Sequence, residues 1–262
     1  MPPSLSSPSP VRLDRARRPA TARLAQIARL GPLAQPASSA RPGPAPDVPS
    51  VSPNVVAVLF GVLGLAWGFA ADRIGARWPA HDDRSVRGID WRTAAVMLIG
   101  GGALYLLPLR YSDGPMLALF GAWFLVLQLL LATDLDQRLL PDVITLPMIP
   151  ITLVLAVAGW DPLVRGQLVP AVIAAIALPL LLFLLSIPFG AGAIGMGDIK
   201  LLVSVGLLTG LGRAVLGVVA AALLSGVVVL LLLASRRVTL KSYIPFGPFL
   251  IIGAFWSVLV TT

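Results

Sequence analysis

The stretch MLALFGAWFLVLQLLLATDLDQRLLPD, residues 116–142, is a long apolar run that ends in a series of charges beginning at Asp134. Its apolar part is close to the roughly 20 residues that a helix needs to cross the hydrocarbon core of a bilayer. Further apolar runs flank it on both sides, and charged residues make up only 12% of the 262-residue chain. In soluble domains, charged residues make up about a quarter of the chain. The sequence therefore predicts an all-α, polytopic membrane protein.

Apolar runs bounded by charges predict about eight transmembrane helices. We expect these spans near 54–71, 93–108, 114–132, 143–159, 167–189, 199–212, 214–234 and 245–260. The sixth span is short, and its separation from the seventh depends on Gly210, Gly212 and Arg213, so seven spans are an alternative. In the loops, ten Lys and Arg residues lie on the side of loop 72–92 and three on the other side, which predicts that loop 72–92 is cytoplasmic. The Arg-rich N-terminal tail then lies outside, against this rule, but only Arg41 is within about 15 residues of the first span, where the rule has most force.

Residues 1–53 have a different composition, rich in Arg, Pro, Ala and Ser. They hold seven Arg and two Asp, which is +5 of the chain's net charge of +8. Such a segment cannot bury a core, so we predict a disordered basic tail over 1–53 and a transmembrane domain over 54–262. Because most of the basic excess lies in this tail, we expect the lipid bilayer, and no nucleic acid, as a partner.

The chain has no Cys, no Glu and a single His, His81. It therefore lacks the Cys/His clusters that hold zinc and any cysteine nucleophile. All 12 acidic residues are Asp, so carboxylate chemistry would have to use aspartate. We expect neither a metal nor a cofactor.

Ionisable groups at membrane depth cost several kcal/mol and are functional candidates by default. Asp134 lies at the end of the apolar run that begins at Met116, and Asp198 lies between two apolar segments. Two complete spans, 143–159 and 167–189, separate these aspartates. An even number of crossings returns the chain to the face that it left, so both carboxyl groups should lie at the same face of the membrane.

Two carboxyl groups a few ångströms apart cannot both ionise, so one keeps its proton while the other is anionic. The anionic group can take a proton from water as it attacks a peptide carbonyl, and the protonated group can donate to the leaving amine. Gly195 and Gly197 would let a substrate backbone or a neighbouring helix approach Asp198 closely.

The neighbouring charges have simpler interpretations. Asp142 precedes a span, which favours a helix N-cap over a catalytic group. Asp136 lies among polar residues in a short loop, which is typical of a solvated charge. Arg138 and Lys200 are interpreted first as topology anchors.

Three segments resemble the prepilin peptidases, the type IV leader peptidase family of GxGD membrane aspartyl proteases. Asp134-Leu135 with Leu140-Pro141-Asp142 is similar to the family's first aspartate motif, and Gly195-Met196-Gly197-Asp198 is similar to its GxGD motif. The third segment is Tyr243-Ile244-Pro245-Phe246-Gly247-Pro248-Phe249-Leu250. The resemblance covers residues 114–256.

This resemblance implies an eight-helix fold in the bacterial inner membrane, with Asp134 and Asp198 as the catalytic pair near the cytoplasmic face. Its implied substrates are type IV pilin-like or pseudopilin precursors, whose basic leader is cleaved after a glycine. Many bacterial members have two CxxC pairs in the loop after the first span and also N-methylate the product. Loop 72–92 has no cysteine and the chain has no Glu, which argues against N-methylation here.

Two other classes stay open from the residues alone. A proton- or ion-coupled transporter could use paired intramembrane aspartates as a relay, although transporters usually place such groups near the midplane and within inverted repeats. An inert scaffold of a secretion or pilus machine would need neither aspartate.

Overall fold

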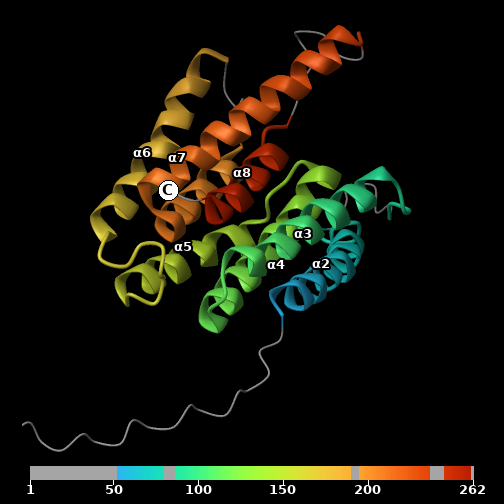
Figure 1. Ribbon diagram of the computed structural model, residues 1–262. Coiled ribbons are helices and arrows are strands. Elements are labelled where there is room, and N and C mark those ends of the chain that lie inside the picture. Colours follow the sequence, from blue (N-terminus) through green and yellow to red (C-terminus); the bar gives the residue numbers. More distant parts are fainter. Residues whose placement is uncertain (1–51, 80–85, 190–194, 237–244, 261–262) are drawn as a thin grey trace, which may run out of the picture. The chain divides into compact units, whose positions relative to one another are not determined.

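The computed structural model describes residues 52–79, 86–189, 195–236 and 245–260. These residues form α-helices and one short 3-10 helix, and they contain no strand, so the prediction of an all-α fold is confirmed (Figure 1). The elements are α2 (Pro53–Gly75), α3 (Trp91–Arg110), α4 (Gly114–Gln137), α5 (Asp142–Val157), α6 (Leu168–Ser186), η1 (Ile187–Phe189), α7 (Met196–Ala234) and α8 (Gly247–Leu259). The predicted tail lies outside the described residues, except that residues 52 and 53 already form the start of α2.

The first helices begin at residues with clear capping chemistry. Ser52 accepts a hydrogen bond from the amide of Val55, and Pro53 occupies the first helical position, where a missing N–H costs nothing. At the start of α3, Asp90 accepts from the amide of Arg92 at 2.9 Å, and the amide of Asp90 donates to Thr93. These caps satisfy amides that a helix cannot pair internally.

Five of the described helices are long and apolar enough to cross a membrane, namely α2, α3, α4, α6 and α7. Helices α5 and α8 are apolar but shorter. Helix α7 has 39 residues, so a straight helix would be roughly 58 Å long, about twice the thickness of a bilayer core. It is interrupted at Gly210, whose φ of 71° and ψ of 175° are not helical. The described part of the chain thus has eight apolar helical segments, and the break lies where the sequence separates the sixth and seventh spans.

Helix α4 lies between two groups of helices. On one side it packs against α2 and α3, which pack closely on each other, and on the other side it packs against α8. Helix α7 packs against α5, α6 and α8, so α8 connects the α4 group to the α7 group (Figure 1). Helix α4 contributes large side chains to the core that they share, including Phe120, Phe124 and Leu127. The middle of the bundle therefore fixes the helix that carries Asp134.

Polar side chains also join α4 to its neighbours inside the bundle. The amide nitrogen of Gln128 donates to the carbonyls of Gly64 in α2 and Val96 in α3, at 2.9 and 3.0 Å. The indole of Trp67 donates to the carbonyl of Leu125 at 2.8 Å. Many large apolar side chains on the outer surfaces of the helices are exposed, as expected for surfaces that contact lipid.

Glycine allows the backbones of α6 and α7 to approach each other. A Cβ atom added at Gly206 would lie 2.6 Å from the amide nitrogen of Ala175 in α6, far closer than a real contact. Small residues at such crossings allow close packing of membrane helices, which association in a bilayer requires.

We expect Gly206→Ala to destabilise the protein by about 1–3 kcal/mol, because the methyl group would force α6 and α7 apart. The matched control is Gly226→Ala in the same helix, since a Cβ atom there would have no neighbour within 4 Å. We expect the free energy of unfolding of this control to equal that of wild type or to exceed it by up to about 1 kcal/mol. Thermal unfolding in detergent measures both, and equal responses of the two variants would contradict the packing argument.

Candidate functional site

Asp134 lies in the last turn of α4, and its side chain is almost completely buried. The carbonyl of Asp134 accepts a hydrogen bond of 2.9 Å from the amide of Arg138. Arg138 has a φ of 55°, in the left-handed region, and this conformation ends the helix. Oxygen Oδ2 of Asp134 is buried and has no hydrogen-bond partner within the described residues.

Asp198 lies in the first turn of α7, and it is also buried. Gly195 precedes the helix, and its carbonyl accepts a hydrogen bond of 3.1 Å from the amide of Asp198. A Cβ atom at Gly197 would lie 2.6 Å from the Cβ of Leu140, so only glycine allows α7 to start this close to the segment after α4. A Cβ atom at Gly195 would make only an ordinary contact of 3.5 Å with the Asp198 carboxyl group.

Both aspartates line one cavity of about 530 Å³. Its walls come from four parts of the chain: residues 78–79 after α2, the segment from the end of α4 to the start of α5, the start of α7, and the start of α8. The lining residues are Trp78, Pro79, Asp134, Arg138, Leu139, Leu140, Pro141, Asp142, Val143, Gly195, Met196, Gly197, Asp198, Lys200, Pro245, Phe246 and Gly247. The structure thus brings together Asp134, Asp198, Gly195 and Gly197, as the even number of crossings leads us to expect.

Gly247 is a residue of this cavity to which the sequence assigned no role. A Cβ atom at this position would overlap the carboxyl group of Asp134, so the backbone at the start of α8 lies directly against it. The signal in the sequence is the Pro-Phe-Gly-Pro run at 245–248, which marks a helix start but does not reveal a contact with α4.

The interpretation of Asp142 as a helix N-cap is wrong. Pro141 is the N-cap of α5, and Asp142 is the first helical residue, without a side-chain capping bond. Its carboxylate instead pairs with the ammonium group of Lys200 at 2.6 Å. This ion pair joins the starts of α5 and α7 at the wall of the cavity.

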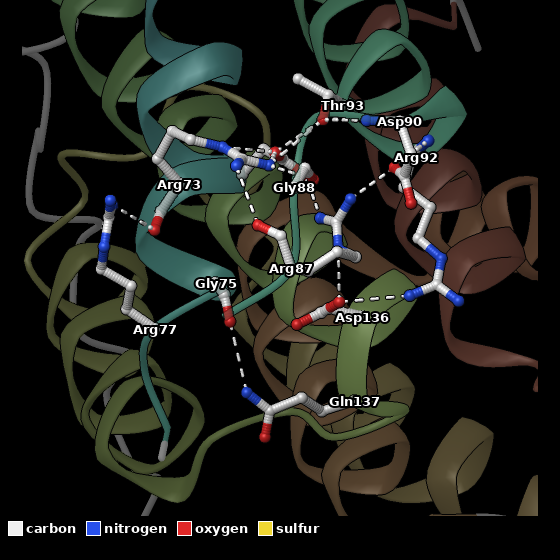
Figure 2. A network of polar contacts seen from close by, with 11 residues as sticks. Arg73, Gly75, Arg77, Arg87, Gly88, Asp90, Arg92, Thr93, Asp136 and Gln137 are labelled. Atoms are coloured by element: carbon white, nitrogen blue, oxygen red, sulfur yellow. Dashed lines mark hydrogen bonds and ion pairs between the residues drawn. The ribbon is translucent and has the colours of Figure 1, made fainter. Parts of the chain in front are cut away.

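The interpretation of Asp136 as a solvated loop charge is also wrong. Asp136 belongs to the last turn of α4, and only 2% of its side chain is exposed. It accepts from Arg87 at 2.6 Å and from Arg92 at 3.2 Å (Figure 2). The two guanidinium groups offset the free-energy cost of removing this carboxylate from water.

Asp161 is a further buried aspartate that lies away from the cavity, in the connection between α5 and α6. Its Oδ1 accepts from the amide of Leu163 at 2.9 Å, whereas its Oδ2 has no hydrogen-bond partner within the described residues. No group of three or more His, Cys, Asp or Glu residues in the described part of the chain is arranged to hold a metal ion.

Comparison with known proteins finds similarity to one family. Residues 118–231 match the type IV leader peptidase family. The prepilin leader peptidase/N-methyltransferase of Pseudomonas aeruginosa is 27% identical over 206 residues, which cover 79% of this chain and 66% of that protein. The proteins of the same name from Dickeya chrysanthemi and Pseudomonas putida are 33% and 32% identical. These matches cover 65% of this chain in both cases, and 61% and 53% of the two relatives.

The chain therefore spans less than two thirds of the length of these relatives. The search of solved structures finds no significant match.

We expect Asp161 to make the stability of the protein depend on pH. Burial raises the pKa of Asp161 to about 7, although the amides of Leu163 and Val164 and the charge of Arg213 oppose this. The folded chain then binds more protons than the unfolded chain between about pH 4 and 7, so stability should fall as the pH rises through this window. Thermal unfolding at several pH values should show a flatter profile for Asp161→Asn than for wild type. An unchanged profile in Asp161→Asn would contradict the assignment.

Proposed function

We infer that this chain, which belongs to the type IV leader peptidase family through residues 118–231, is an aspartic endopeptidase of the bacterial inner membrane. The observation that carries the proposal is the shared cavity, because two buried aspartates from helix ends far apart in the sequence line it together. A pair of carboxyl groups in one buried site is the arrangement that aspartic proteases use.

The proposed chemistry needs one anionic and one protonated carboxyl group. The anionic member of the pair Asp134 and Asp198 takes a proton from a water molecule as the water attacks the scissile carbonyl. The protonated member donates its proton to the developing oxyanion. When the C–N bond breaks, the first carboxyl group passes the proton that it took from water to the leaving amine, and the hydroxyl proton returns to the second carboxyl group. This reaction requires no metal and no cofactor. Oδ2 of Asp134 has no hydrogen-bond partner in the described residues, so it can accept a hydrogen bond from the water or the substrate.

The proposed substrates are type IV pilin-like or pseudopilin precursors, cleaved after a glycine to release the basic leader. The names of the relatives support this, since each is called a prepilin leader peptidase. The position of the cavity supports it as well. Asp134 is in the last turn of one membrane helix and Asp198 in the first turn of another, so the site lies at helix ends. A precursor with a charged leader and a long apolar helix would present its scissile bond at this depth.

The position of the cavity also argues against the transporter alternative, because transporters usually place their ion-binding carboxylates near the midplane of the bilayer. The proposal does not extend to N-methylation. The relatives are named for that activity too, but this chain has neither Glu nor Cys.

Asp134→Asn and Asp198→Asn should each abolish cleavage of a prepilin precursor, because either change removes one of the two proton-transfer groups. The matched control is Asp161→Asn, the same substitution at another buried aspartate away from the cavity, and it should still cleave. Amino-terminal sequencing and mass spectrometry of the product measure cleavage after glycine, and the mass also reports any methyl group. Continued cleavage by the double Asp134/Asp198 variant would overturn the proposed mechanism.

Gly247→Ala should lower the rate of cleavage by about 100-fold, because the added methyl group must displace the carboxyl group of Asp134. Gly114→Ala is a matched control, since both glycines are the first residue of a helix and both precede a proline. A Cβ atom at Gly114 has no neighbour within 4 Å, so this variant should cleave at the wild-type rate. Equal rates for the two variants would show that the start of α8 does not constrain Asp134.

A further inference from the structure

A partly buried network of charged residues lies beside the candidate site, at the ends of α2 and α4 and the start of α3. It contains three aspartates and three arginines, so its formal charges balance. The members are Asp72, Arg73, Arg87, Asp90, Arg92 and Asp136, and Thr93 joins them through its hydroxyl group (Figure 2). None of these residues lines the cavity.

Arg87 is the centre of this network. Three of its nitrogens make ion pairs with three different carboxylates: Asp72 at the end of α2, Asp90 at the start of α3 and Asp136 at the end of α4. Only arginine has enough donors in a fixed planar fork for such an arrangement. Although burial opposes its charge, the hydrogen bonds to Asp72 and Asp136 raise the pKa of Arg87 above its ordinary value. Arg87 therefore ties three helix ends together as a permanent cation.

The network holds the turn of α4 that carries Asp134. Asp136 is two residues further along the helix, so the two side chains project about 200° apart, on opposite sides of α4. Asp134 lines the cavity, whereas Asp136 pairs with Arg87 and Arg92. A rotation or fraying of this turn would move both carboxyl groups at once.

Gln137 adds a second attachment at the same place. Its side-chain nitrogen donates to the carbonyls of Gly75 and Pro79, at 3.2 and 2.7 Å. Helix ends normally fray, and this end is followed at once by the left-handed Arg138. The last turn of α4 is thus fixed to the connection between α2 and α3 by consecutive residues, 136 and 137.

We propose that Arg87, acting through Asp136, is a positioning residue that holds the last turn of α4 so that Asp134 faces Asp198 across the cavity. The role in cleavage rests on the proposed function, whereas the fixing of the helix end does not. Residues 86–92, at the end of the loop that we interpret from the sequence as cytoplasmic, then form part of the support of the candidate site.

The test compares wild type with Asp136→Asn, Arg87→Gln and the double variant, all as the full chain in detergent. Amide hydrogen exchange reports the order of residues 134–138, and cleavage of a prepilin precursor peptide gives kcat and KM. The control is Arg77→Gln, because Arg77 is exposed on the same connection and donates only to the carbonyl of Arg73 among the described contacts.

We expect faster exchange in residues 134–138 of all three variants, with the rest of α4 protected as in wild type. The value of kcat should fall by about 10- to 100-fold, since small misplacements of a catalytic group have effects of this size, while KM changes little. Because the two residues share one ion pair, the loss in the double variant should be smaller than the sum of the losses in the two single variants. Arg87→Lys, which keeps the charge but loses the fork, should fall between wild type and Arg87→Gln. The control should match wild type throughout.

Two results would overturn the proposal. One is wild-type exchange in residues 134–138 together with a wild-type kcat. The other is a uniform rise of exchange along the whole of α4, which would mean that the network supports the fold in general and not this turn. If wild type itself does not cleave the precursor, the proposed function fails, and the exchange data alone decide whether Arg87 and Asp136 hold the helix end.

Discussion

A carboxyl group at membrane depth must be enclosed by protein, and this constraint organises the molecule around Asp134 and Asp198. Neither aspartate could be buried by its own helix, because the outer surfaces of the helices carry apolar side chains suited to lipid. Helices α5 and α6 lie between these aspartates in the sequence, and the end of α4 and the start of α7 line one cavity. Residues 78–79 after α2 and the start of α8 also line this cavity.

The two sides of Asp134 are supported by different physical means. On the side of α8, glycine at position 247 lets backbone reach the carboxyl group without a side chain between them. On the opposite side of α4, ion pairs and the hydrogen bonds of Gln137 hold the same turn. Uncharged backbone therefore lies against Asp134 on the side of α8, whereas the ion pairs that hold its turn lie on the opposite side of α4.

Much of this arrangement could be predicted from the sequence, because membrane spans are encoded locally. Apolar runs gave the helices close to their observed bounds, and Gly210 marked the break in α7 since a positive φ favours glycine. The parity of crossings predicted only that Asp134 and Asp198 lie at the same face, whereas their shared cavity results from the packing of the helices. Asp136, Asp142 and Gly247 could not be interpreted in this way. Their partners are Arg87, Lys200 and Asp134, and each pair joins segments that only the packed bundle brings together.

The central claim is that both carboxyl groups act on one reacting centre. Its most direct test is the affinity of a peptide that spans the leader junction of a precursor, with a hydroxyl-bearing isostere in place of the scissile carbonyl. Such a group imitates the tetrahedral intermediate and would hydrogen-bond to both aspartates, so wild type should bind it more tightly than the unmodified peptide. Asp134→Asn and Asp198→Asn should each lose this advantage, whereas Asp161→Asn should keep it. Equal affinity of wild type and both cavity variants for the isostere would contradict the account.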